Sequence, residues 1–174
     1  MKKILLIFLL VNGHVFAGLK KAEEYYNKRD KIKNSNLLIF QELFKSKYFF
    51  SSVPFAAEHI IQSPSIDQNF EDMLEILVLK TGTTTLTGID SSDLAKHKTP
   101  STSLILGLKL FNEDKYTQAI EALAHVPTGP RFSPDAALIR GSSYNLLSSY
   151  SNAVSAYDQC ISTSNQFEKE SRNL

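Results

Sequence analysis

Hydrophobic residues recur at three- and four-residue steps along most of this chain, which is the pattern of helices with one buried face. The first such stretch runs from residue 36 to 48 and carries Leu37, Phe40, Leu43 and Tyr48. A second helix is predicted to begin at residues 51–54, because Pro54 is tolerated in a first turn, and to end near residue 63. A third is predicted over 67–80 and a short one over 90–96. The pattern therefore predicts an all-α fold.

Two stretches depart from this periodicity. Residues 81–88 hold two Gly and five Thr, which disfavour a helix, so a loop or a short extended segment is predicted there. Residues 18–33 hold six basic and three acidic residues, and Lys20, Glu24 and Lys28 have the four-residue spacing of an exposed helix. We expect a solvated, frayed leader helix in this stretch rather than a binding patch.

The N-terminus has the parts of a cleavable signal peptide. Lys2 and Lys3 give it a positive start, residues 4–11 are an unbroken apolar run, and Val15 and Ala17 occupy the positions that signal peptidase reads. The run is far shorter than the roughly 20 residues that span a bilayer. We therefore expect cleavage after Ala17 and no transmembrane helix in the mature chain. Gly18 follows where a lipid-modified signal would have Cys.

Charge and cysteine content narrow the possible partners. The chain has 19 basic and 18 acidic residues, and loss of Lys2 and Lys3 leaves 17 against 18, a net charge of −1. Such a chain has no electrostatic attraction to nucleic acid or to an anionic membrane, so neither is expected as a partner. Cys160 is the only cysteine. An internal disulfide is impossible, and stability must come from helix packing.

The last third of the chain repeats itself. Five residue pairs are separated by 34 positions in one constant register: Gly107 and Gly141, Tyr116 and Tyr150, Ala119 and Ala153, Ile120 and Val154, Leu123 and Tyr157. Each copy is predicted to be a helix hairpin, over 101–112 with 115–126 and over 135–147 with 150–162. The glycines fall mid-helix, where glycine is unfavourable unless another helix comes close. The alanines are small enough to permit that approach, and the tyrosines can pack across the turn.

This pattern resembles the tetratricopeptide repeat family, whose 34-residue helix–turn–helix has a Leu-Gly pair, a Tyr after the turn and then an Ala. The matching repeat-packing positions are Gly107, Tyr116, Ala119, Gly141, Tyr150 and Ala153. Departures are Arg140 and Leu110, and Asp114 and Ser148 at a turn position where Gly is common. The close resemblance covers about residues 100–163. Upstream, helix pairs beginning near 36 and 66 have a similar step but no matching residues, so degenerate repeats there remain open.

The resemblance implies an α-solenoid, a right-handed superhelix whose concave groove holds a peptide or a partner helix. By position, the partner-binding residues are expected to be Leu104, Leu108, Phe111, Asn112, Leu138, Ser142 and Asn145. The alternative is that the three apolar residues of the first unit simply pack against the preceding helix pair. The set lacks the Lys-rich clamp by which some members hold a C-terminal carboxylate, so that ligand is not predicted.

No catalytic residues, metal site or cofactor are predicted. His59, His97 and His125 lie in separate segments, without a second ligand at helical spacing, and are expected to be surface or structural histidines. Cys160 falls at a small, buried position and is expected to be a core thiol. A run of acids after residue 70 is expected to be a solvated helix face: Glu71, Asp72 and Glu75.

The sequence thus divides into a signal peptide (1–17), degenerate helical hairpins (18–99), two repeats (100–163), and a capping helix or truncated further repeat (164–174). We expect a non-enzymatic protein–protein interaction module, a scaffold or adaptor in a bacterial cell-envelope assembly, exported and periplasmic or envelope-associated. Two other functions remain open. One is an N-terminal accessory domain of a larger envelope enzyme, and the other is an inert structural spacer.

Overall fold

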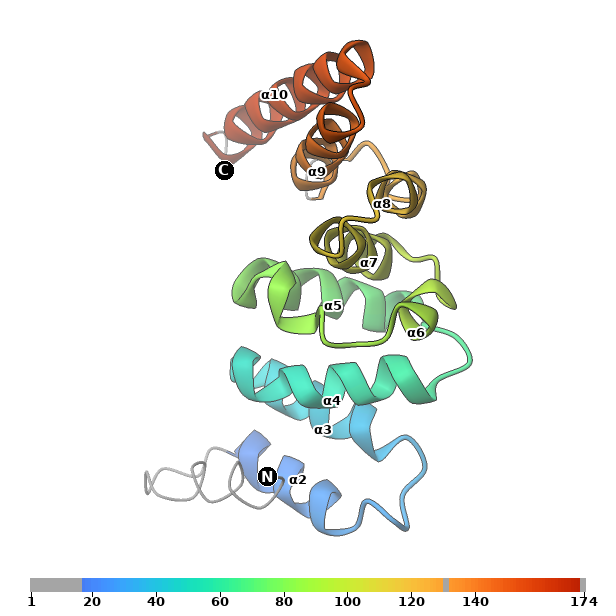
Figure 1. Ribbon diagram of the computed structural model, residues 1–174. Coiled ribbons are helices and arrows are strands. Elements are labelled where there is room, and N and C mark those ends of the chain that lie inside the picture. The colour runs from blue at the N-terminus through green and yellow to red at the C-terminus, as the bar shows by residue number, and fades with distance from the viewer. Residues whose placement is uncertain (1–16, 130–131, 173–174) are drawn as a thin grey trace. The chain divides into compact units, whose positions relative to one another are not determined.

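The computed structural model describes residues 17–129 and 132–172, with side chains up to residue 165 (Figure 1). The predicted signal peptide lies outside this part, apart from Ala17. All regular structure in the described residues is helical, as the sequence predicts. The elements are α2 (Ala17–Asn27), α3 (Ser35–Lys45), α4 (Phe49–Gln62), α5 (Gln68–Thr81), the 3-10 helix η1 (Thr83–Leu86), α6 (Ser91–Ala95), α7 (Pro100–Asn112), α8 (Tyr116–Leu123), α9 (Ser133–Leu146) and α10 (Tyr150–Arg172).

The chain forms two compact units. One takes in the chain up to Ser63 together with Asp72–Gly82, and the other takes in Pro64–Glu71 and the chain from Thr83 on. In the first unit α3 packs against both α2 and α4. In the second unit each of α6, α7, α8 and α9 packs against the next helix along the chain, and α7 also contacts η1 and α9.

Helix α2 is more than the solvated leader that its charge pattern predicts. Ala22 is buried in a cluster with Ile39 and Leu43, and Leu19, Tyr25 and Tyr26 pack against that cluster. The Tyr26 ring also meets the Phe55 ring edge-on, with centroids 6.3 Å apart. The charged side lies opposite, where Lys28 Nζ lies 2.7 Å from Glu24 Oε1. Four apolar residues among many charges are enough to bury one face of this helix.

Helix α4 begins two residues before the predicted start. Phe49 is its first residue and Pro54 lies inside it, beyond the first turn. The Phe49 ring meets the Phe44 ring edge-on at 5.3 Å, which ties the start of α4 to the end of α3. Packing across this turn therefore sets where the helix starts, at the cost of the hydrogen bond that Pro54 cannot donate.

The three helix hairpins, α3–α4, α7–α8 and α9–α10, share one turn. Each has a single residue with left-handed backbone, at φ 63° for Lys47 and 59° for both Asp114 and Ser148. The next N–H then reaches back five residues: Tyr48 N to Leu43 O at 2.9 Å, Lys115 N to Leu110 O at 2.9 Å, and Ser149 N to Tyr144 O at 2.8 Å. This is the Schellman ending of a helix. The first hairpin therefore has the same turn as the other two. Its left-handed residue, Lys47, lies 67 positions before Asp114 of the second hairpin.

The mid-helix glycines lie where paired helices cross. A Cβ on Gly107 would lie 2.4 Å from Leu123 Cγ, and one on Gly141 would lie 2.5 Å from Tyr157 Cε1. The residues opposite the glycines are therefore the large members of the repeat at positions 123 and 157. Ala119 and Ala153 are buried as well, and Ala119 packs with Leu110 and Ala122.

The same register places Phe40 and Ala56 of the first hairpin where the second has Gly107 and Leu123. Both are completely buried. Here the bulky side chain belongs to the first helix and the small one to the second, which inverts the arrangement of the later hairpins. The register positions of this hairpin therefore hold different residues from those of the later hairpins, and the sequence shows no matching residue there.

The segment before α7 is also more ordered than its composition predicts. Residues 83–86 form η1 rather than an irregular loop, and its Leu86 is buried. Lys109 Nζ donates to the carbonyl oxygen of Thr87 at 3.1 Å, tying the segment to α7. One buried leucine and one side-chain hydrogen bond thus outweigh the poor helix propensity of threonine and glycine.

Glu71 is not part of a solvated face. Its side chain is buried, and its Oε1 accepts a hydrogen bond of 2.7 Å from the backbone N–H of Ser101 in the first turn of α7. Thr99 and Thr102 form a reciprocal capping box at the same helix end. A carboxylate at a helix N-terminus satisfies free N–H groups and complements the helix dipole, which offsets the cost of its burial.

Two helices differ in length from the prediction. Helix α8 ends at Leu123, three residues before Val126, and α10 continues to Arg172. Residues 164–172 are thus the last part of α10, where a separate capping helix or a new repeat was expected.

The turn geometry predicts a stabilising substitution at Ser148. Glycine adopts left-handed backbone without the strain that a Cβ causes, so Ser148→Gly should raise the free energy of unfolding by about 1 kcal/mol. Ser149 lies next to it and outside the left-handed region, so Ser149→Gly should give no gain. Chemical denaturation of both variants measures this. Equal effects at the two positions would contradict the account of the turn.

The helix crossing predicts non-additive substitutions. Gly107→Ala should cost about 1 to 3 kcal/mol by overpacking against Leu123, and Leu123→Ala about 2 to 5 kcal/mol by leaving a cavity. The double variant should lose clearly less than the sum, because the new Cβ occupies part of the cavity. Gly88→Ala is the control, since a Cβ there meets nothing within 4 Å. Additive losses in a denaturation cycle would refute the proposed contact.

Candidate functional site

The four predicted partner-binding residues of α7 do not lie equally open to solvent. Leu104 is completely buried and offers no surface to a partner. Leu108 and Phe111 are half-buried, and Asn112 is exposed. The Phe111 ring packs against the Tyr116 ring at 5.7 Å. Leu104 is therefore a packing residue and not a binding residue. Leu108 and Phe111 are partly packed and partly accessible to a partner.

The predicted residues of α9 are more open. Leu138 is 50% exposed and Asn145 is exposed. Ser142 is half-buried, with its Oγ 3.5 Å from the hydroxyl of Tyr157. Leu146, one residue beyond Asn145, is 53% exposed. Helices α7 and α9 contact each other, and their accessible predicted residues, with Leu146, are treated together as a candidate surface. We call it the α7/α9 face: Leu108, Phe111, Asn112, Leu138, Asn145 and Leu146.

A second apolar surface runs along α10. Tyr150, Val154 and Ile161 are each more than half exposed and lie four and seven residues apart, on one side of the helix. Their counterparts on α8 are different: Tyr116 and Ile120 are half-buried, since α9 packs against α8. No described helix covers α10 in the same way. The spacing of these three residues is visible in the sequence, but their exposure depends on what packs beside them.

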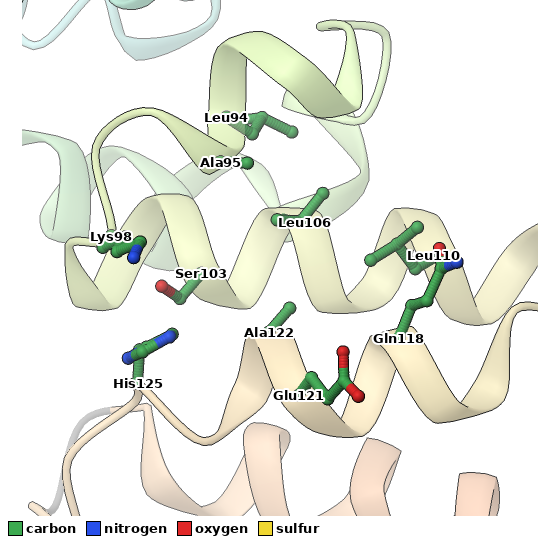
Figure 2. A pocket seen from close by; sticks show the side chains of 10 residues that line it. All are labelled: Leu94, Ala95, Lys98, Ser103, Leu106, Leu110, Gln118, Glu121, Ala122 and His125. Carbon is green, nitrogen blue, oxygen red and sulfur yellow. The ribbon is translucent and has the colours of Figure 1, made fainter.

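A pocket opens on another side of α7, between α6 and α8 (Figure 2). Its volume is about 240 Å³. The apolar part of its lining comes from all three helices: Leu94, Ala95, Leu106, Leu110 and Ala122. None of the predicted partner-binding residues lines it. The pocket is lined by residues from three separate segments of the chain, so no local sequence pattern indicates it.

Five polar residues complete the pocket lining: Lys98, Ser103, Gln118, Glu121 and His125. Lys98 and His125 lie at one end, beside Ser103, and Gln118 and Glu121 lie towards the other (Figure 2). Lys98 precedes α7 with left-handed backbone at φ 47°. The pocket thus combines an apolar floor with a basic end, which sequence analysis had no means of assembling from three separate segments.

The clearest electrostatic shifts near these surfaces are at the turn between α7 and α8. The Tyr116 hydroxyl donates to Asp114 Oδ1 at 2.6 Å, and this hydrogen bond raises the pKa of Tyr116. Hydrogen bonds from Lys115 and Lys109 lower the pKa of Glu113. The side chains of Tyr116 and Glu113 both lie at the surface, and these hydrogen bonds link residues on the two sides of the turn. They stabilise the turn without creating a reactive group.

The chemistry-bearing residues singled out in the sequence are scattered. His59 is buried, with Nδ1 3.1 Å from Ser63 Oγ, whereas His125 is exposed in the pocket. Cys160 is a free, half-buried thiol, more open than a core position implies. Within the described ranges, no three side chains of the metal-binding types gather at one point.

The same ranges contain no helix with the length and hydropathy to cross a bilayer. Comparison with known proteins adds no assignment: no protein-family model, curated protein or solved structure matches this chain.

Proposed function

We propose that this protein is an exported interaction module of the tetratricopeptide-repeat type, which binds a peptide or partner helix on the α7/α9 face. The observation that carries the proposal is the exposure of Leu138 and Leu146, two leucines of α9 that lie eight residues apart and are each about half open to solvent. Exposed leucines clustered on one face, with amides beside them, are typical of a surface that another protein covers.

The 34-residue register supports the choice of this face. It gives α7 and α9 the same sequence of positions, so that Leu108 and Ser142 correspond, as do Phe111 and Asn145. A partner lying across both helices would meet apolar side chains from α7 and α9 and the amides of Asn112 and Asn145. The amides can pair with a peptide backbone, which fixes its register while leucine contacts supply affinity.

The remaining parts of the proposal rest on the sequence. The segment 1–17 supports export, and with it a place in the periplasm or cell envelope of a bacterium. The near-neutral mature chain supports a protein partner over nucleic acid. A scaffold or adaptor role in an envelope assembly follows from these features together. An inert spacer would have no use for exposed leucines on α9, and this distinguishes the two functions experimentally.

The test replaces the two exposed leucines and spares the half-buried residues of α7. A photoreactive residue at Asn145 in the native chain would first capture the partner in intact cells. The double variant Leu138→Glu, Leu146→Glu should keep its stability within about 1 kcal/mol, since both side chains are already half exposed. It should lose the captured partner at least tenfold, because two carboxylates would lie against an apolar contact.

The matched control is Leu79→Glu, a leucine of α5 that is 51% exposed. The native protein, the double α9 variant and the Leu79→Glu variant would each be purified and used to pull down the captured partner. Only the double α9 variant should lose binding. Undiminished binding by that variant, or equal loss with Leu79→Glu, would reject the α7/α9 face as the binding surface.

A further inference from the structure

The pocket between α6 and α8, here called the α6–α8 pocket, lies beside a short helix. Helix α6 is only five residues long and ends at Ala95. In the first hairpin the second helix, α4, has 14 residues. The short α6 leaves Leu106 half-buried on the side of α7 that faces the pocket. The result is a recess with an apolar floor on the side of α7 away from Leu108.

The size of the recess limits what it can hold. Pockets for cofactors and drug-sized ligands span roughly 300 to 1,000 Å³, and this one measures about 240 Å³. It is large enough for one apolar side chain with a small polar neighbour. Leu94, Leu106 and Leu110 would surround that side chain. Such a recess fits one anchor residue of a peptide, not a cofactor.

The charged residues around the recess indicate which kind of residue would lie next to the apolar side chain in a bound peptide. Lys98 and His125 lie together at one end, and both are exposed. Within the described part of the chain neither side chain has a hydrogen bond or an ion pair. By contrast, Lys96 nearby is paired with Asp93. An ammonium and an imidazole without partners, beside one apolar recess, complement a carboxylate. Glu121 also lines the pocket and lies between His125 and Gln118, and no hydrogen bond or ion pair joins it to Lys98 or His125 in the described residues.

We propose that the α6–α8 pocket binds an acidic segment of a partner protein, through one apolar side chain in the recess and an adjacent Asp or Glu held by Lys98 and His125. The apolar contact supplies binding energy, and the basic end selects the acidic neighbour. Gln118 and Glu121 can accept or donate hydrogen bonds to the backbone of the bound segment. This site is separate from the α7/α9 face, so either can fail without the other.

The test uses small probes on the full chain. The capped dipeptide acetyl-Asp-Leu-amide carries one apolar side chain and one carboxylate. Titrated against protein with labelled leucine methyl groups, it should shift the NMR signals of Leu94, Leu106 and Leu110 and leave those of Leu138 and Leu146 in place. Acetyl-Asn-Leu-amide, which lacks the charge, and acetyl-Asp-Ala-amide, which lacks the anchor, should each bind more weakly.

Substitutions around the pocket sharpen the test. Lys98→Gln should weaken binding of acetyl-Asp-Leu-amide by roughly 2- to 5-fold, the effect of one exposed charge pair. His125→Ala should also weaken it, because the ring N–H that can donate to the carboxylate is lost. Ala95→Leu should abolish it by filling the recess from an exposed position on α6. Lys96→Gln is the matched control and should leave binding unchanged. Equal binding of the Asp and Asn probes, shifts confined to Leu138 and Leu146, or no shift at all would each overturn the proposal.

Discussion

The structure depends on the closeness of the two helices in each hairpin. At Gly107 and Gly141 the backbone comes so near its partner helix that a single Cβ would overlap Leu123 or Tyr157. The backbone at the crossing is thereby covered by a large side chain from the other helix, and full burial of a residue such as Leu123 contributes roughly 1.5 to 3 kcal/mol. The left-handed turn residue fixes the register that brings these positions together. The turn and the helix crossing therefore act together. Both recur at the same positions in the two later hairpins, 34 residues apart.

That constraint decides which side chains are left for binding. Once position 107 faces position 123, Leu104 is directed into the core, while α9 presents Leu138 and Leu146 to solvent. The same register places Leu106 and Leu110 on the other side of α7, where the short α6 leaves them under the pocket. The two candidate surfaces therefore differ in chemistry: the α7/α9 face is apolar with amides, and the pocket is an apolar recess with a basic end.

Local pattern predicted the helices and the two later hairpins, because periodicity and a fixed offset are properties of sequence alone. Three of the errors involve contacts between segments distant in sequence. The apolar face of α2, the burial of Leu86 and the placement of Glu71 at the start of α7 each need a neighbour that no local window contains. The two helices of the first hairpin were predicted, but its relation to the later repeats stayed open because Phe40 and Ala56 differ from Gly107 and Leu123 at the same register positions. The pocket is assembled from α6, α7 and α8 and the residues that flank them, which no local window contains together.

The most direct test of this shared packing rule is a double-mutant cycle at Phe40 and Ala56, measured by denaturation of the full chain. Phe40→Ala should cost about 3 to 5 kcal/mol by leaving a cavity, and Ala56→Leu about 1 to 3 kcal/mol by overpacking. If the two residues fill one crossing, the double variant should be more stable than the sum of the single effects predicts, by about 1 to 3 kcal/mol. Strict additivity would mean that Phe40 and Ala56 do not face each other, and that the first hairpin does not share the packing of the other two.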